Sequence, residues 1–292
     1  MRNVVLGLVQ FAMSPDIKKN HDKAEEMVRN LAKQGANIIL IPELFEAPYF
    51  CKEMRAEYFS MAQPRHNHPL LKKFSAIAKE LSVAMPISFF ENDNNVYYNS
   101  IVMLDADGRD MGLYRKSHIP DGDGYEEKYY FSPGDSGFQI WQTGFGKIGV
   151  GICWDQWFPE VARIMALKGA EVLLYPTAIG SEPPAPDYDS SHHWQATMCG
   201  HAAANIIPLV AANRIGKEKA KNGTEVVFYG ASFIADPSGK KIAEAPRDKE
   251  ASLSYSFDLE AIGTLRRSWG VFRDRRPELY GDILTLDGHT RG

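Results

Sequence analysis

Short apolar runs of the kind that form strands alternate with helical patterns along nearly the whole chain. Residues 4–9 form the first run, and apolar side chains then recur between Ala24 and Leu31 at helical spacing. Residues 37–41 form a second run, rich in isoleucine, that stops at Pro42. Because strands that alternate with helices pack as sheets covered by helices, this order predicts an α/β fold.

The same alternation continues towards the C-terminus without a linker. Further helices are expected over residues 70–81 and 192–205, and one starts near Pro159. Strands are expected at residues 84–90, 100–104, 112–115, 138–141, 147–152, 172–175 and 209–212, and at 232–235 and 252–257 on either side of a turn at 236–239. We therefore expect one domain over residues 1–292. The arginine-rich segment from about residue 266 should be irregular and pack on the body or on a neighbouring subunit.

Composition argues against several classes of protein. The formal net charge of −4 gives no electrostatic footprint for nucleic acid. The chain has no apolar run of about 18 residues, so we expect no membrane span. Cys51, Cys153 and Cys199 are far apart and odd in number, which argues against a disulfide framework. The first residues lack the features of a signal peptide, so we expect a cytoplasmic protein with reduced thiols.

Three polar residues stand directly after predicted strands. They are Glu43, Lys116 and Cys153. Strand ends are the usual positions of functional groups in α/β folds, and these three side chains would converge if their strands were neighbours. A thiol, a carboxylate and an ammonium group can serve as nucleophile, general base and stabiliser of a developing oxyanion. The pattern therefore predicts a cysteine hydrolase whose nucleophile is Cys153.

Each of these residues also has an ordinary structural explanation. Cys153 lies between a glycine-containing strand and a helix start, as in a nucleophile elbow, but free cysteines are often simply buried. Glu43 could be a surface or capping carboxylate, and Lys116 a solvated charge. The catalytic interpretation of each residue therefore depends on the other two.

A helical stretch rich in histidine offers a different interpretation. His192, His193 and His201 share it with Cys199, and imidazole and thiolate are zinc ligands. The spacing does not match a compact zinc motif and no paired acid completes a ligand set, so packing or interface histidines are the favoured interpretation. We expect no metal or organic cofactor.

The segments around the three polar residues resemble a known family. Ile41-Pro-Glu, Tyr114-Arg-Lys-Ser-His-Ile-Pro and Gly151-Ile-Cys-Trp-Asp resemble the signature segments of the carbon–nitrogen hydrolase (nitrilase) superfamily, in order and separation. The resemblance implies a four-layer α-β-β-α sandwich, assembly into homodimers or larger oligomers, Glu43 as base, Lys116 as oxyanion stabiliser and Cys153 as nucleophile. Tyr125-Glu-Glu-Lys-Tyr-Tyr-Phe resembles the segment with an assisting glutamate, which implies Glu127 rather than Glu126.

Within the superfamily, the chain most resembles members that hydrolyse N-carbamoyl amines ending in an ammonium group. Burying that charge requires a carboxylate. Glu182 follows a predicted strand on the same edge as the catalytic residues, and Asp121 lies in the long loop after Lys116. Tyr125 and Trp154 complete the expected substrate site, with the Trp154 backbone N–H facing the oxyanion. A nitrilase, an aliphatic amidase, an N-carbamoyl amino acid hydrolase and a non-catalytic assembly protein remain alternatives.

Overall fold

The first sheet joins the beginning of the chain to its end. In the computed structural model, which describes residues 1–289, β1 (Asn3–Gln10) pairs in parallel with β2 (Ile38–Leu40) and antiparallel with β14 (Ala251–Asp258). An antiparallel meander of β3 (Met85–Asp93), β4 (Val96–Leu104) and β5 (Asp110–Arg115) continues this sheet. The connection is made beside β2, where the Ile39 N–H donates to Ala84 O at 3.0 Å.

The second sheet contains six strands in the order β13-β12-β9-β8-β7-β6. Its strands are β6 (Ile140–Thr143), β7 (Gly146–Val150), β8 (Val172–Pro176), β9 (Leu209–Ala212), β12 (Phe233–Ala235) and β13 (Lys241–Glu244). The central strands β7, β8 and β9 are parallel and fully buried along most of their length, because both faces of the sheet are covered.

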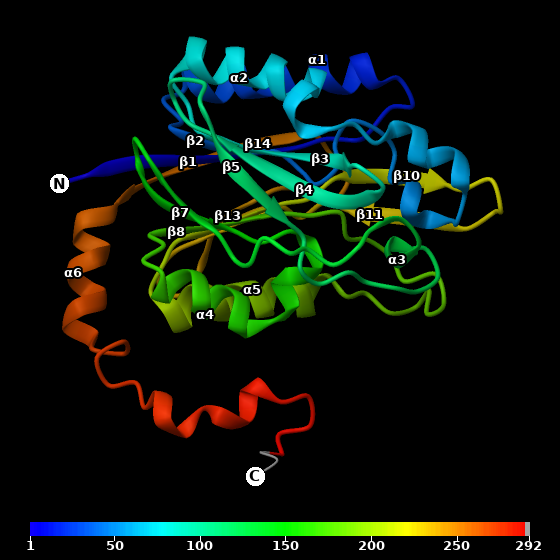
Figure 1. Cartoon of the computed structure of the whole chain (residues 1–292). Helices are drawn as coiled ribbons and strands as arrows, with labels where there is room; N and C mark the ends of the chain where they lie inside the picture. The colour runs from blue at the N-terminus through cyan, green and yellow to red at the C-terminus, as the bar shows by residue number, and fades with distance from the viewer. Residues whose placement is uncertain (290–292) are drawn as a thin grey trace.

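Two pairs of helices cover the outer faces of the sheets. α1 (Ile17–Lys33) and α2 (Pro69–Leu81) cover the first sheet, and α4 (Pro159–Leu167) and α5 (Ser191–Asn205) cover the second (Figure 1). The predicted four-layer α-β-β-α sandwich is thereby confirmed.

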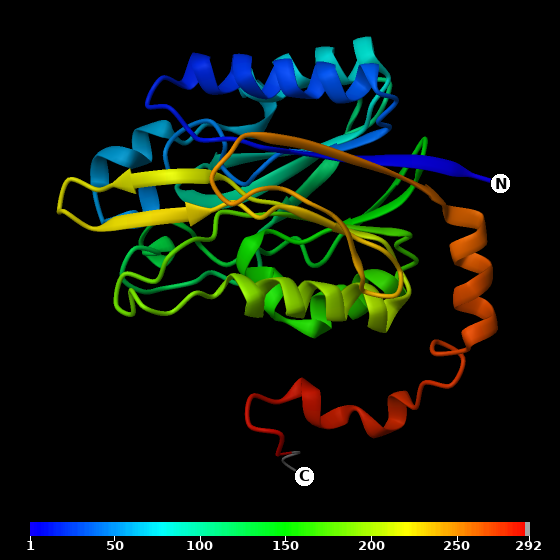
Figure 2. The same ribbon diagram turned by 180° about the vertical axis from the view of Figure 1, so that it is seen from behind.

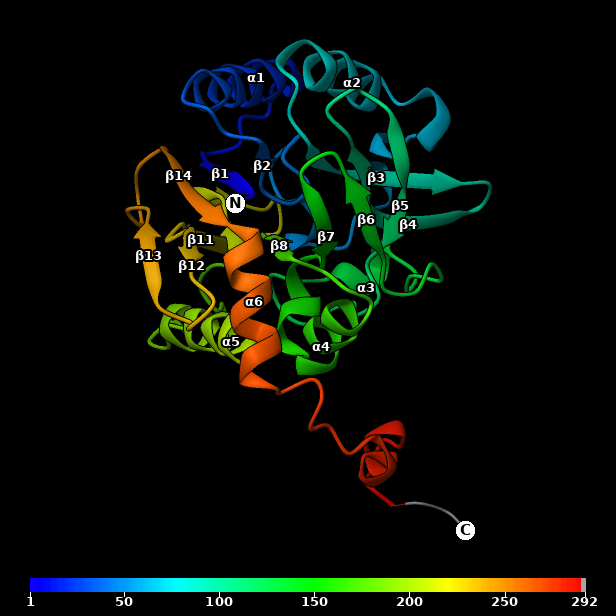
Figure 3. The same ribbon diagram turned by 90° about the vertical axis from the view of Figure 1, so that its left-hand side faces the viewer.

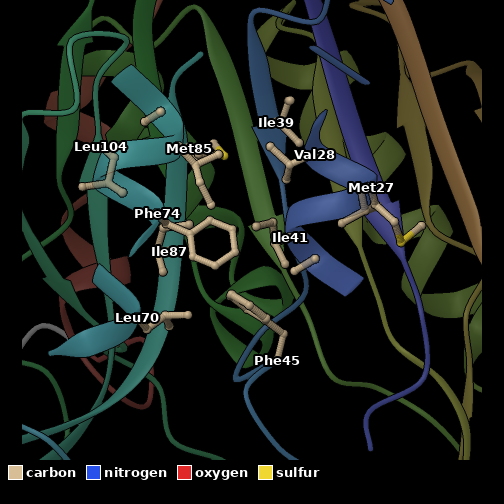
Figure 4. Packing of buried hydrophobic residues seen from close by; sticks show 14 of the residues in the cluster. Met27, Val28, Ile39, Ile41, Phe45, Leu70, Phe74, Met85, Ile87 and Leu104 are labelled. Atoms are coloured by element: carbon tan, nitrogen blue, oxygen red, sulfur yellow. The ribbon is translucent and has the colours of Figure 1, made fainter. Parts of the chain in front are cut away.

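Each interface between layers has its own apolar core. Beneath α1 and α2, Val28 and Phe74 point toward Ile39, Ile87 and other sheet residues (Figure 4), and all four of these side chains are buried. A second cluster lies between the sheets and a third beneath α4 and α5. Burial of these apolar faces is the main stabilising contribution to the sandwich.

The C-terminal strand pairing departs from the expectation. We expected residues 252–257 to flank the turn at 236–239, but the strand after this turn is β13, and β14 crosses to pair with β1 at the opposite end of the chain (Figure 2). The hairpin of β10 (Ile215–Lys219) and β11 (Glu225–Tyr229) was also not predicted. Buried and exposed residues alternate along both strands. The charged residues of β10, Lys217, Glu218 and Lys219, interrupt the apolar pattern by which a strand is recognised.

The chain ends in a helix and an extended segment. α6 (Leu259–Trp269) runs down one side of the molecule, and residues 270–289 project from the body (Figure 3). The expectation of irregular structure from residue 266 was wrong for residues 266–269, because Arg266 and Arg267 complete the last turn of α6 and Gly270 ends it with φ +80°.

Shorter helices occupy the long connections. They are α3 (Glu127–Tyr130) and the 3₁₀ segments Phe50–Lys52, Ala56–Met61, Arg65–Asn67, Cys153–Trp157, Pro277–Leu279 and Gly281–Leu284. None of the helices in residues 1–289 has the length and apolar character needed to cross a bilayer.

Candidate active site

A buried lysine lies between two buried carboxylates. Lys116 Nζ donates to Glu43 Oε1 at 2.9 Å and to Glu127 Oε2 at 2.7 Å, and all three residues are closed to solvent. Glu43 follows β2, Lys116 follows β5, and Glu127 begins α3 in the loop after Lys116. Burial of three charges without water is tolerated because each one has an opposite partner at hydrogen-bond distance.

Burial and the neighbouring charges shift the pKa values of Lys116 and Glu127. Desolvation acts to lower the pKa of Lys116, but Glu127 and Glu43 outweigh it and hold that pKa well above its ordinary value. Burial raises the pKa of Glu127 to about 7, although Lys116 opposes the rise. Lys116 therefore stays a cation, as a fixed positive charge requires.

Cys153 stands at the turn that follows β7. Its φ of +41° lies in the left-handed region, which is strained for a residue with a side chain. Asp155 stabilises the turn, because its Oδ2 accepts the Ile152 N–H at 3.0 Å and the Tyr114 hydroxyl at 2.7 Å. Sγ of Cys153 lies 3.7 Å from Ala178 O. This is the strand, sharp turn and helix of a nucleophile elbow.

The thiol of Cys153 is held in its protonated form. Burial and the nearby carboxylate of Glu43 raise its pKa well above the ordinary value, and Lys116 only partly offsets them. A thiol in this environment could act as a nucleophile only with a base that removes its proton. Glu43 has a carboxylate oxygen available as that base, since Oε1 accepts from Asn99 and Lys116 whereas Oε2 is buried without a hydrogen-bond partner among residues 1–289.

Cys153 and Glu127 open into a pocket of about 140 Å³. Each of the predicted substrate-site residues, Asp121, Tyr125, Trp154 and Glu182, lines the same pocket. Glu43 and Lys116 are not among its lining residues and lie behind Glu127 and Cys153. The pocket therefore combines a buried end, at Cys153 and Glu127, with acidic residues nearer the surface, since Glu182 is half-buried and Asp121 and Asp123 are exposed.

The side chains at the mouth differ in how firmly they are held. The Tyr125 hydroxyl accepts the Gly180 N–H at 2.9 Å and donates to Ser181 O at 3.1 Å, so it is fixed beside Glu182. Glu182 is half-buried, and burial raises its pKa, opposed by a hydrogen bond from Ser190. A cation beside Glu182 would offset the energetic cost of burying its ionised carboxylate. Asp121 and Trp154 are exposed at the rim.

The strand-end residues converge by a different route from the one expected. Convergence was expected on the condition that their strands were neighbours, but β3 and β4 lie between β2 and β5, and β7 belongs to the other sheet. Glu43 and Lys116 meet because the two side chains reach across the end of the first sheet. Cys153 joins them because the second sheet faces the first.

Supporting residues of this cluster were not predicted from the sequence. Tyr49 donates to Glu127 Oε1 at 2.7 Å, and Asn99 donates to Glu43 Oε1 at 2.6 Å. Both are buried. A buried asparagine inside a largely apolar strand is a local signal that could have identified Asn99, whereas Tyr49 lies in an irregular segment whose sequence gives no such signal.

Arg214 fixes the segment that carries Glu43. It is fully buried, and its Nη2 donates to Glu43 O at 2.7 Å and to Leu44 O at 2.9 Å. Its Nη1 donates to Glu218 Oε1 at 3.2 Å. Glu218 in turn accepts the Tyr49 N–H at 2.7 Å. The β10–β11 hairpin therefore anchors both the carboxylate that faces Cys153 and the tyrosine that bonds Glu127.

The histidine-rich stretch on α5 serves packing. The ring of His201 is buried and bonds Gln156 O at 2.7 Å, and His193 lies against Trp157 with ring centroids 4.8 Å apart. In the part of the chain that the structure describes, no group of three or more His, Cys, Asp or Glu side chains could hold a metal ion. The zinc alternative therefore has no ligand set in residues 1–289.

Known proteins are similar to this chain over nearly its whole length. The carbon–nitrogen hydrolase family model matches residues 5–267. N-carbamoylputrescine amidase of Arabidopsis thaliana is 57% identical over 291 residues, which cover 99% of this chain and 97% of that protein. A citrullinase of Francisella tularensis is 53% identical over 284 residues, which cover 97% and 99%.

A solved structure has the same fold. The carbon–nitrogen hydrolase from Helicobacter pylori G27 superposes with a TM-score of 0.91 at 37% sequence identity, covering 98% of this chain and 99% of that one. The similarity extends over both sheets and all four layers, because almost every residue of each chain is aligned.

Proposed function

The chain belongs to the carbon–nitrogen hydrolase family, and from this premise we propose that it converts N-carbamoylputrescine and water to putrescine, carbon dioxide and ammonia. The observation that carries the proposal is the pocket itself, which is lined both by the buried Cys153 thiol and by the half-buried carboxylate of Glu182. A carbamoyl group at the thiol would leave the ammonium end of this substrate near a half-buried carboxylate. The product would supply a diamine for polyamine biosynthesis.

In the proposed reaction, Glu43 removes the proton from Cys153. The thiolate then attacks the carbamoyl carbon, and Lys116 and the Trp154 backbone N–H stabilise the oxyanion. The bond to the terminal nitrogen breaks, Glu43 returns the proton and ammonia leaves, so a thiocarbamate on Cys153 remains. The free Oε2 of Glu43 and the high pKa of the thiol support this assignment.

The second half of the reaction uses the same groups. Glu43 deprotonates a water molecule that attacks the thiocarbamate, and the thiolate leaves with the proton returned to it. The resulting carbamic acid loses carbon dioxide and yields putrescine. Glu127 positions Lys116 throughout, a role supported by its 2.7 Å contact with Nζ. No step calls on a cofactor.

Citrulline is a second candidate substrate because a relative at 53% identity is named a citrullinase. Citrulline is also an N-carbamoyl amine, but it carries an α-carboxylate beside its ammonium group. The described residues that line the pocket include Asp121, Asp123 and Glu182 and no lysine or arginine. A carboxylate would be repelled there without a positive partner, which favours the substrate that lacks one.

Ammonia release from a panel of compounds tests the proposal. The panel contains N-carbamoylputrescine, citrulline, neutral N-carbamoylbutylamine, an N-carbamoyl amino acid, an aliphatic amide and a nitrile. We expect the highest kcat/KM with N-carbamoylputrescine. A higher value with citrulline would replace the proposed substrate, and a preference for the neutral analogue would remove the role of the acidic mouth.

We also propose that the protein works as a homo-oligomer in the cytoplasm. Exposed apolar side chains on the segment after α6 support assembly, among them Leu279, Ile283 and Leu284 at 65%, 63% and 86% exposure. Clustered exposed apolar groups mark interaction sites. Light scattering on the full chain would test this, because a monomeric mass at micromolar concentration contradicts assembly.

A further inference from the structure

A second cavity is lined in part by the segment that follows Glu43. It has a volume of about 360 Å³, within the range of small-molecule sites. Its wall is formed by the start of α1, the segment after β2, the 3₁₀ segment Ala56–Met61 and the start of α2. None of its lining residues lines the pocket of Cys153, so the two sites are separate.

One end of this cavity carries a group of polar side chains. Glu46 Oε1 lies 2.8 Å from His21 Nε2, at hydrogen-bond distance. Glu46 Oε2 lies 3.6 Å from His68 Nε2, which is too far for a hydrogen bond. His68 is only 3% exposed, and neither of its ring nitrogens has a hydrogen-bond partner among residues 1–289. A buried imidazole in this state lacks the partner that such groups normally have.

The charge of the cavity wall favours a cation. Burial lowers the pKa of His68, so its ring is neutral near pH 7 and offers a lone pair. Glu46 supplies a carboxylate, and the described lining residues include no lysine or arginine. An anionic ligand would face Glu46 without a counter-ion, whereas an ammonium group would find acceptors on both Glu46 and His68.

The remainder of the wall suits an aliphatic chain. Phe50 and Phe90 stack with their ring centroids 5.1 Å apart, and Leu44 and Met61 lie on the same cavity. Aromatic faces also attract cations. The cavity thus combines an apolar body with one negatively charged end.

We propose that this cavity is a second ligand site for a small primary alkylammonium compound. Its ammonium group donates to Glu46 and to His68, and its alkyl chain lies against Phe50, Phe90 and Met61. The site does not depend on the reaction proposed for Cys153, because the two sites share no residue. It does share a chain segment with that reaction, since Leu44 directly follows Glu43.

Methionine methyl groups provide a selective probe. Met61 lies on the second cavity, and no methionine is among the described residues that line the catalytic pocket. The full-length protein is labelled with [¹³C-methyl]methionine, the Met61 resonance is assigned with Met61→Leu, and butylammonium chloride is titrated at constant ionic strength. We expect a saturable shift of Met61, whereas a shift that never saturates, or none, would overturn the proposal.

Neutral 1-butanol and two substitutions separate the alternatives. Butanol should bind about ten-fold more weakly than butylammonium to the wild-type protein, because it lacks the charge-assisted hydrogen bonds. Glu46→Gln should weaken the binding of butylammonium by a similar factor and leave the remaining methionine resonances unchanged. The matched variant Glu182→Gln should leave the Met61 titration unaltered.

Three further results would contradict the proposed site. They are equal affinity for butanol and butylammonium, unchanged butylammonium affinity in Glu46→Gln, and loss of the Met61 shift in Glu182→Gln. The first comparison uses wild-type protein only, so it decides the question even if Glu46→Gln fails to fold. A negative outcome here leaves the ammonia-release panel for Cys153 chemistry unaffected.

Discussion

The ammonium group of Lys116 lies 2.7 Å from Glu127 Oε2, in a place where neither side chain touches solvent. Burial alone would favour the neutral forms of both groups. Their contact keeps Lys116 charged beside Cys153, while the pKa of Glu127 is still raised to about 7. The state of Glu127 should therefore control the activity of the site within the physiological pH range.

Activity should fall as the pH drops through about 7. Glu127 is an acid with a raised pKa of about 7, so acidification protonates it and removes one of the two charges that hold Lys116 in place. The pH profile of kcat should show this acidic limb. A flat profile between pH 5 and about 8 would contradict a role for ionised Glu127.

Tyr49→Phe should move the acidic limb of the kcat profile to higher pH. The hydrogen bond from Tyr49 lowers the pKa of Glu127, so its loss should raise the pKa and leave less active enzyme at pH 7. Tyr58→Phe is the matched control, because the Tyr58 hydroxyl bonds Glu53 and not Glu127. An identical limb in wild type and Tyr49→Phe would show that this hydrogen bond does not tune Glu127.

Cys153→Ser should reduce turnover by roughly 10³-fold or more while preserving the fold, since the hydroxyl is a far weaker nucleophile at this position. Cys199→Ser is the control, because Cys199 is a half-buried residue of α5 that does not line the pocket. Ammonia release and thermal unfolding measure the two effects. Near-normal turnover by Cys153→Ser would refute the proposed mechanism.

Glu182→Gln should change substrate preference rather than chemistry. Loss of the carboxylate should lower kcat/KM for N-carbamoylputrescine by about 10- to 100-fold, the value of a partly buried charge-assisted contact. The value for neutral N-carbamoylbutylamine should stay within about two-fold, because its chain end has no charge to pair. Equal losses for both substrates would show that Glu182 is structural.

Arg214→Lys should destabilise the protein and impair kcat. Lysine cannot reproduce the paired hydrogen bonds to the carbonyls of Glu43 and Leu44, so these buried acceptors lose their donors, although Lys52 at 2.8 Å keeps Glu218 paired. We expect a loss of about 3 kcal/mol in the free energy of unfolding. Arg273→Lys, on the exposed C-terminal segment, should have little effect on either quantity. Wild-type stability and kcat in Arg214→Lys would contradict the anchoring role.

The sequence by itself determined the local elements and the chemistry of the strand ends. Periodicity located α1, α2 and the buried strands, because a helix or strand records its buried face in neighbouring residues. The motifs around Glu43, Lys116 and Cys153 identified the family, and the resemblance of the segment after Lys116 predicted a supporting role for Glu127. These signals are local, so they require no knowledge of which strand pairs with which.

Only the tertiary structure decided how those residues meet. The pairing of β14 with β1 closes the first sheet. The second sheet faces the first, and this packing brings Cys153 to Lys116 and Glu43. Arg214 bonds a carbonyl 171 positions earlier in the chain, and a contact of that range leaves no periodic trace. Long-range hydrogen bonds are specified by packing of whole layers, which is why the anchors Tyr49, Asn99 and Arg214 emerged only from the fold.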